Sequence, residues 1–150
     1  MMETRLTVAA LVHWQGRFLM VEEEIGGERR FNQPAGHVEA GETLTEAMCR
    51  ELYEESGLKL APTAWLGASL FRPHDTAATY VRFAFVFELE NPPGDHHPED
   101  PDGDVLACHW WTREEIAERR ASLRSPLVWQ TIDNYLAGTR LPLHALQAHM

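Results

Sequence analysis

Cysteine is scarce in this sequence, which has only Cys49 and Cys108 among 150 residues. One possible pair is too few for a disulfide framework in a chain of this size, so we expect a protein of a reducing compartment. Long apolar runs are also missing. No stretch approaches the roughly 18 residues that a membrane-spanning helix needs, and the N-terminus lacks the apolar centre of a secretion signal. The sequence therefore predicts a cytoplasmic protein without a membrane partner.

Positive charge is the second shortage. Lysine and arginine number 13 against 23 aspartates and glutamates, which gives a formal net charge of −10. An acidic protein of this kind is a poor nonspecific binder of nucleic acid, because the phosphate backbone repels it. If the protein handles phosphates, it must do so with a bound metal ion or with a few well-placed arginines.

The length and the pattern of apolar residues predict one mixed α/β domain over residues 1–150. A loosely held tail is expected at 141–150, because it is short and unpatterned. The main irregular segment, 91–104, is rich in proline and acidic residues. Strands are expected at 6–13, 18–24, 30–33, 58–70, 79–89 and 105–111, and helices at 43–56, 112–120 and 126–138.

The helix expected at 43–56 has clear start and stop signals. Thr43 and Glu46 have the spacing of a capping box, in which each side chain accepts a hydrogen bond from the other residue's backbone amide. Gly57 stands where a left-handed residue would end the helix. A further capping box is expected at Thr112, and Ser125 before Pro126 predicts the start of the last helix.

Three glutamates make one face of this helix unusually acidic. Glu51, Glu54 and Glu55 spread over roughly 100° of its surface, and Glu51 repels Glu55 one turn away. Taken alone, such a run is typical of a solvated helix face. A divalent cation would offset the repulsion equally well, because Mg²⁺ prefers carboxylate and water oxygens.

The wider spacing around these glutamates resembles a known pattern. Gly36, five residues, Glu42, seven residues and then Arg50-Glu-Leu-x-Glu-Glu-x-Gly57 is similar to the Nudix box, with every defining position filled. The resemblance implies the Nudix fold, an α/β/α sandwich around a mixed β-sheet. It also implies a hydrolase of phosphoanhydride bonds that uses Mg²⁺ or Mn²⁺.

The resemblance further implies roles for the residues of the box. The metal ligands would be Glu51, Glu54, Glu55 and a backbone carbonyl near Ala35, with Arg50 orienting one of the glutamates. Gly36, Glu42 and Gly57 would support the box, and Glu51, Arg50 and Glu54 would be catalytic. The general base is left open between Glu51 and an acid of the irregular segment, namely Glu99, Asp100, Asp102 or Asp104.

Segments outside the box resemble one bacterial subgroup, the NudJ-type phosphatases. They include residues 32–37, Arg82-Phe83, Trp110-Trp111 and residues 123–128. This resemblance implies release of phosphate from thiamine-pathway pyrophosphates, such as hydroxymethylpyrimidine pyrophosphate and thiamine pyrophosphate, and from nucleoside di- and triphosphates. Two alternatives remain: a pyrophosphohydrolase of the ADP-ribose or oxidised-nucleotide type, which cuts a nucleoside diphosphate linked to another group, and a nucleotide sensor without turnover. Whether the protein is a monomer or a homodimer is undecided.

Three residues outside the box are candidates for contacting substrate. Gln33 either hydrogen-bonds a base edge or is a satisfied amide at the end of a strand. Arg124, beside the Ser125 helix start, either meets a terminal phosphate or is a surface arginine. Arg82 alternates with apolar neighbours in its strand, so it either contacts substrate or lies on the solvent face.

Overall fold

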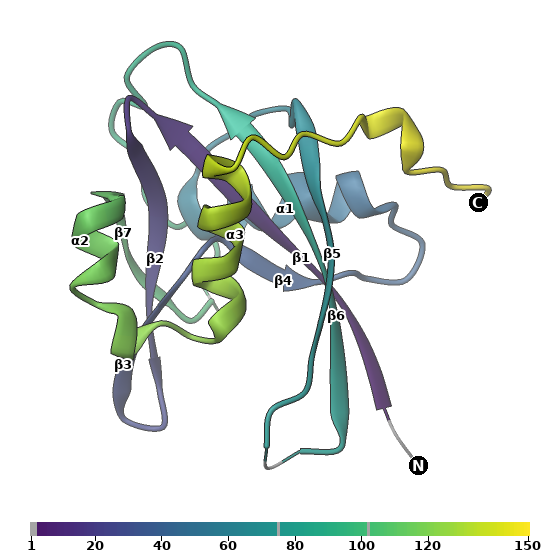
Figure 1. Ribbon diagram of the computed structural model, residues 1–150, viewed down its shortest axis with the longest axis horizontal. Helices are drawn as coiled ribbons and strands as arrows, with labels where there is room; N and C mark the ends of the chain where they lie inside the picture. The colour runs from purple at the N-terminus through teal and green to yellow at the C-terminus, as the bar shows by residue number, and fades with distance from the viewer. Residues whose placement is uncertain (1–2, 75, 102) are drawn as a thin grey trace.

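The structure is a computed structural model that describes residues 3–74, 76–101 and 103–150. Across these residues one seven-stranded mixed sheet lies between α-helices, with α1 behind it and α3 in front (Figure 1), which confirms the expected α/β sandwich. The strands are β1 (Glu3–Trp14), β2 (Arg17–Ile25), β3 (Glu28–Asn32), β4 (Ala35–His37), β5 (Ala64–Phe71), β6 (Ala78–Glu88) and β7 (Val105–Thr112). The helices are α1 (Leu44–Ser56), α2 (Arg113–Ala117) and α3 (Pro126–Leu136), with short 3₁₀ turns at Arg120–Ser122 and Leu143–Ala145.

Strand β1 is the centre of the sheet. One edge pairs with β6 in parallel, from Glu3↔Ala78 to His13↔Glu88. The other edge is shared: β4 pairs with its middle, at Thr7–Ala9, and β2 pairs with its end, at the β1–β2 turn. Because β3 and β7 both pair with β2, the sheet has two halves that splay apart from this turn (Figure 1). The space between the halves is where the functional site forms.

The expected helix signals are all present. Thr43 caps α1 and exchanges both capping-box hydrogen bonds with Glu46, and Gly57 ends the helix with φ 79°. Thr112 caps α2 through a second capping box. Ser125 caps α3, whose first residue is Pro126.

The sheet buries apolar residues on both faces. On one face, Met48 and Leu52 of α1 pack in a cluster with Val8 of β1. On the other, Ile132 of α3 packs in a second cluster with Leu11. Since neighbouring residues of β1 pack on opposite faces, its central run, residues 8–12, is apolar at every position rather than at every second one.

Strand β4 is the main element that the sequence did not predict. Pro34 ends β3 as expected, but its carbonyl accepts a hydrogen bond from the Ala10 amide at 2.8 Å and the chain then continues beside β1. The three residues of β4 are two small residues and a histidine, which carry little strand signal. Their strand geometry comes from pairing with Thr7–Ala9, a long-range contact.

Other boundaries also differ from expectation. The strand after α1 begins at Ala64 rather than near residue 58. Helix α2 ends at Ala117, well short of residue 120, and the chain then turns so that the Arg119 guanidinium lies 4.1 Å from the Trp111 ring centre. Among the described helices, none is long and apolar enough to cross a membrane.

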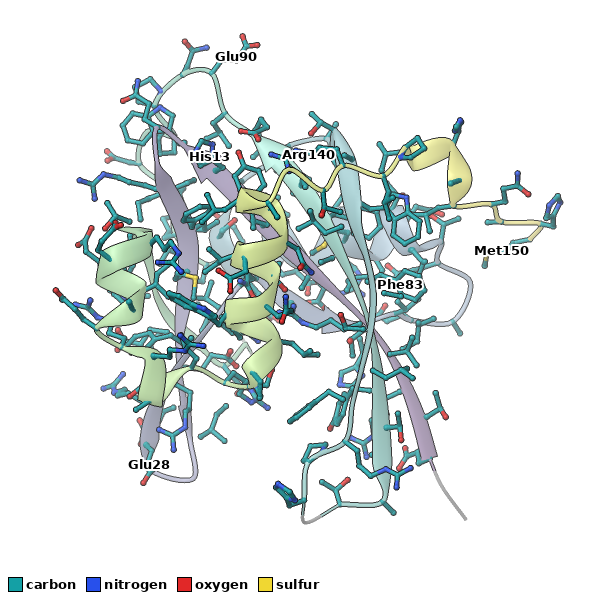
Figure 2. All side chains as sticks on the ribbon, in the orientation of Figure 1. His13, Glu28, Phe83, Glu90, Arg140 and Met150 are labelled. Atoms are coloured by element: carbon teal, nitrogen blue, oxygen red, sulfur yellow. The ribbon has the colours of Figure 1, made fainter. Side chains whose placement is uncertain are left out.

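The C-terminal segment is held more firmly than its sequence predicts. Leu141 bridges to Trp65, and the Trp65 indole N–H donates to the Pro142 carbonyl at 2.9 Å. Leu143 and Leu146 pack against the cluster beneath α1. Only the residues after Leu146 fit the expected loose tail, and Met150 points away from the body of the protein (Figure 2).

Deleting residues 141–150 should therefore destabilise the protein. Three hydrogen bonds to Trp65 and three partly buried leucines are lost, which predicts a fall of about 2 kcal/mol or more in the free energy of unfolding. Deleting only residues 147–150 is the matched control and should change it by less than about 0.5 kcal/mol. Urea unfolding measures both, and equal effects of the two deletions would contradict the packing of residues 141–146.

Candidate active site

Arg50 organises the acidic face of α1. Its guanidinium makes a two-pronged contact with Glu42, at 2.6 and 2.9 Å, and donates to the His37 carbonyl at 3.0 Å. Its remaining terminal nitrogen donates to Glu51 at 2.9 Å and to Glu54 at 3.2 Å. These contacts lower the pKa of Glu42 to about 2, chiefly through the Arg50 hydrogen bonds. The arginine thus ties the loop before the helix to two of the three helix glutamates.

Position 36 has no room for a side chain, because the Glu51 carboxylate occupies the space where a Cβ would lie. A Cβ built on Gly36 would lie 2.1 Å from the carboxyl carbon of Glu51. The glycine is therefore required for close packing, and it lets α1 present Glu51 directly against the backbone of β4.

The third glutamate reaches the same strand. The Ala35 amide donates to Glu55 at 2.9 Å. Ala35 pairs with Ala9 at a non-hydrogen-bonded position of the ladder, because Pro34 and Val38 bond to Ala10 and Leu6 of β1 and bonded pairs fall on every second residue. The amide and carbonyl of Ala35 both point away from β1 as a result. The Ala35 carbonyl thus faces the same side of β4 as the amide that Glu55 accepts from.

Crowding raises the pKa values of two of these carboxyl groups. Burial raises the pKa of Glu55 well above its usual range, and the nearby Glu23, Glu51 and Glu54 add to the effect. Burial likewise raises the pKa of Glu51, although Arg50 opposes it. Such a cluster of oxygen donors short of positive charge is the environment that a hard divalent cation suits.

The carboxylate oxygens of this cluster do not converge on a single point where a cation would bind. Among the described residues, no three His, Cys, Asp or Glu side chains already form a metal-binding group. Arg50 engages oxygens of Glu51 and Glu54, while the Ala35 amide engages one of Glu55. The residues fit a metal in chemistry and placement, but their carboxylates would have to turn toward one another to share it.

These carboxylates form one wall of a cleft of about 570 Å³ between the two halves of the sheet. The opposite wall is built by the end of β5, by β6 and by the start of α3. The lining residues outside the box include Thr7, Glu23, Asn32, Phe71, Tyr80, Arg82, Asp100, Asp104, Arg124 and Ser125. The cleft therefore has an acidic wall and a wall with two arginines.

Arg124 is brought to the cleft by backbone contacts. Its amide donates to the Phe31 carbonyl at 2.8 Å, and it directly precedes the Ser125 cap of α3. Its guanidinium lies 3.3 Å from Glu23, a nearly buried carboxylate of β2. The side chain of Arg124 is 46% exposed, so it remains open to a ligand.

Arg82 and Gln33 form a buried polar pair. Arg82 is 8% exposed and lines the cleft, which rules out the solvent-face alternative. Gln33 is 1% exposed and does not line it. The Gln33 carbonyl oxygen accepts from Arg82 at 2.8 Å, and its amide group donates to the Val128 carbonyl at 2.9 Å. The structure thus favours the satisfied-amide alternative for Gln33, whose side chain holds Arg82 instead of reaching the cleft.

The irregular segment 91–104 is docked against the end of α1. The amides of Glu99 and Asp100 both donate to the Glu54 carbonyl, at 2.8 and 3.1 Å. Asp100 and Asp104 line the cleft, whereas Glu99 lies outside it beside Gly57, against which the His97 backbone also packs. Asp102 lies outside the described residues. Of the four acids that the sequence left open, Asp100 and Asp104 are the two that the structure places at the cleft.

Glu23, Tyr80 and Phe71 are cleft residues that sequence reasoning missed. Glu23 carried a usable signal, because it follows Leu19 and Val21 on one face of β2 and so puts an acid where an apolar residue is expected. Nothing in the sequence marked Tyr80 or Phe71 as a cleft residue. They face each other only through the β5–β6 register, which the sequence does not fix.

Comparison with known proteins identifies the family of the chain. The family model described as the NUDIX domain matches residues 3–130. The chain belongs to the Nudix family. It is 42% identical over 147 residues to Phosphatase NudJ of Escherichia coli K12, covering 97% of this chain and 92% of that protein.

Solved structures show the same relationship. A Nudix hydrolase from Nitrosomonas europaea superposes with a TM-score of 0.88 at 34% identity, covering 98% of both chains. A bifunctional NMN adenylyltransferase/ADP ribose pyrophosphatase from Francisella tularensis, complexed with AMP and a Mn ion, shares the fold at a TM-score of 0.68 and 22% identity over 91% of this chain and 42% of that one. The chain is thus a Nudix enzyme that hydrolyses phosphoanhydride bonds, a family that uses divalent metals.

Replacing Gly36 by alanine should disable the site while leaving the fold intact. The new methyl group must displace the Glu51 carboxylate, so we expect at least about a tenfold loss of Mn²⁺ affinity, measured by calorimetry. Circular dichroism should show unchanged secondary structure. Alanine at Gly36 with undiminished Mn²⁺ binding would contradict the placement of Glu51 at the metal site.

Proposed function

We propose that this Nudix enzyme is a phosphatase that releases orthophosphate from the diphosphate ends of small molecules. Its substrates would be thiamine-pathway pyrophosphates, such as hydroxymethylpyrimidine pyrophosphate and thiamine pyrophosphate, and nucleoside di- and triphosphates. The observation that carries the proposal is the cleft itself, since the box glutamates line the same cavity as Arg124 and Ser125 at the start of α3. The 42% identity to Phosphatase NudJ supports the phosphatase activity.

The acidic wall would hold Mg²⁺, or Mn²⁺, through Glu51, Glu54, Glu55 and the Ala35 carbonyl. When bound, the ion would neutralise phosphate charge and acidify a coordinated water. Arg50 keeps Glu51 and Glu54 in place and holds Glu42 ionised beneath them. Gly36 and Gly57 provide the close approaches on which this arrangement depends.

The opposite wall would bind the substrate. Arg124 offers free N–H groups beside the start of α3, where both the guanidinium and the helix favour an anion. Its pairing with Glu23 holds the guanidinium over the cleft. For the general base, Glu51, Asp100 and Asp104 all lie at the cleft, so any of them could serve. Catalysis of this kind depends mainly on positioning and charge stabilisation.

The alternative enzyme would cut a nucleoside diphosphate linked to another group, such as ADP-ribose. The reaction products distinguish the phosphatase from this alternative pyrophosphohydrolase. Orthophosphate from thiamine pyrophosphate or a nucleoside diphosphate supports the phosphatase. Nucleoside monophosphate from ADP-ribose, or pyrophosphate from a nucleoside triphosphate, with no orthophosphate supports the alternative. A sensor without turnover fits less well, since every defining position of the box is filled and Arg50, Glu51, Glu54 and Glu55 all line the cleft.

Glutamine in place of Glu54 should abolish most of the activity. We expect orthophosphate release from thiamine pyrophosphate or a nucleoside diphosphate with Mg²⁺ to fall about a hundredfold or more, because a ligand oxygen and its charge are lost. Thermal stability should not fall, since one carboxylate of a repelling cluster is removed.

The matched control is Glu90→Gln, the same change of charge on the exposed loop at the top of Figure 2. It should leave the rate unchanged. Equal rates for the Glu54 variant and the wild-type enzyme would contradict the proposal, as would a panel of diphosphates from which no orthophosphate is released.

A further inference from the structure

Arg82 is a buried cation that lines the cleft and is held by neutral groups. It is 8% exposed. Its terminal nitrogens donate to Thr131 at 2.7 Å, to Gln33 at 2.8 Å and to Asn32 at 3.2 Å. Thr131 and Gln33 are themselves fixed, since both donate to backbone carbonyls of α3. The guanidinium is therefore held in one place, beside the first turns of α3.

The other two arginines of the cleft are paired with carboxylates. Arg50 contacts Glu42 and two glutamates of α1, and Arg124 contacts Glu23. Among the described residues, no carboxylate forms an ion pair with Arg82. Burial lowers the pKa of Arg82 to about 10, which leaves the guanidinium charged at neutral pH. Burying a charge without a counter-charge is costly, so an anionic ligand at this point would recover part of that cost.

Arg82 keeps N–H groups for such a ligand. A guanidinium carries five N–H donors and no acceptor. The hydrogen bonds to protein oxygens engage Nη1 once and Nη2 twice, and across the described parts of the chain Nε makes none. One N–H of Nη1 and the N–H of Nε are therefore available to a ligand oxygen.

The contacts of Arg82 place its guanidinium close to the acidic wall of the cleft. Gln33, which accepts a hydrogen bond from Arg82, is separated from Ala35 by Pro34 alone, so the Cα atoms of Gln33 and Ala35 lie within about 7 Å of each other. The Ala35 amide donates to a box glutamate, and Ala35 and Arg82 line the same cavity. A phosphate oxygen beside the Ala35 carbonyl would therefore have the rest of its phosphate group within reach of Arg82.

The start of α3 adds charge to this site but no free amide in its first turn. Pro126 has no N–H, and the amides of Leu127 and Val128 donate to the hydroxyl and the carbonyl of Ser125, both at 3.2 Å. The helix dipole still favours an anion at this end. Hydrogen bonds to a phosphate must come from side chains, and the cations that this wall offers are Arg82 and Arg124.

We infer that Arg82 is a catalytic residue that binds the transferred phosphate from the wall opposite the box glutamates. This inference rests on the proposed function of the same cleft. In that reaction a water oxygen bonds to the terminal phosphorus, and the bond from phosphorus to the bridging oxygen breaks with its electron pair on the leaving phosphate ester. A cleft carboxylate accepts the proton of the water. Arg82 stays protonated throughout and stabilises the charge on the phosphate oxygens.

Arg82 and Arg124 have different parts in this arrangement. Arg124 is 46% exposed, and Glu23 cancels part of its charge. Arg82 is fixed by three acceptors and faces no carboxylate partner among the described residues. A charge that is preorganised in a water-poor site needs no reorganisation during the reaction, so it stabilises the transition state more effectively. We therefore expect Arg82 to act mainly on kcat and Arg124 mainly on KM.

Glutamine in place of Arg82 tests this inference, because Arg82→Gln removes the charge and keeps an amide donor. We expect kcat for orthophosphate release from thiamine pyrophosphate with Mg²⁺ to fall about a hundredfold. Arg82→Lys restores the charge and should recover part of the rate. Calorimetry with inorganic phosphate and Mn²⁺ should show about tenfold weaker phosphate binding in Arg82→Gln. The affinity for Mn²⁺ alone should not fall, because a positive charge near the ion is removed.

Arg29→Gln is the matched control, since Arg29 is an exposed arginine that pairs with Glu22 and does not line the cleft. It should change neither kcat nor phosphate binding. Thr131→Val is the second variant, which decides the question if Arg82→Gln does not fold. It removes one acceptor that aims the guanidinium and keeps the charge and the side-chain shape. We expect it to lower kcat about tenfold and to leave Mn²⁺ affinity unchanged.

Unchanged kcat and unchanged phosphate affinity in Arg82→Gln would overturn the inference. A loss of Mn²⁺ affinity that matches the loss of phosphate affinity would overturn it too, because Arg82 would then act only through the fold. Either result leaves the phosphatase proposal standing if the wild-type enzyme releases orthophosphate. If no diphosphate is hydrolysed, the phosphatase proposal fails instead, and the phosphate affinities, which need no turnover, decide on Arg82.

Discussion

The contact between Arg50 and its carboxylates is the interaction on which the site depends. Without the arginine, Glu42, Glu51 and Glu54 would repel one another and the loop before α1 would lose its link to the helix. The same contacts aim Glu51 at the backbone of β4, where only glycine leaves room for it. One ionic network thus fixes the acidic wall of the cleft before any metal or substrate is bound.

The second constraint is the shared edge of β1. Because β4 and β2 pair with different parts of that edge, the sheet opens into two halves, and α3 begins close to the opening. Glu23 and Asn32 reach the cleft from one half, and Thr7, Tyr80 and Arg82 reach it from the other. The acidic wall and the arginine-bearing wall are therefore consequences of strand pairing as much as of the box itself.

The sequence predicted the local features well and the long-range ones poorly. Helix caps at Thr43, Thr112 and Ser125 and the stop at Gly57 depend on neighbouring residues, so they could be found without the structure. Strand β4 and the docking of Leu141–Leu146 depend on partners far along the chain. Gln33 and Arg82 show the same limit, since their contacts with α3 come from a segment almost one hundred positions from Gln33 and about fifty from Arg82.

The most direct test of the account is the position of Mn²⁺ in crystals of the enzyme, located by anomalous scattering with a slowly hydrolysed diphosphate analogue present. The account predicts a peak coordinated by carboxylates of α1 beside the Ala35 carbonyl, with the phosphates toward Arg124. A metal bound elsewhere, with Glu51 and Glu54 still paired to Arg50 and remote from the phosphates, would contradict it.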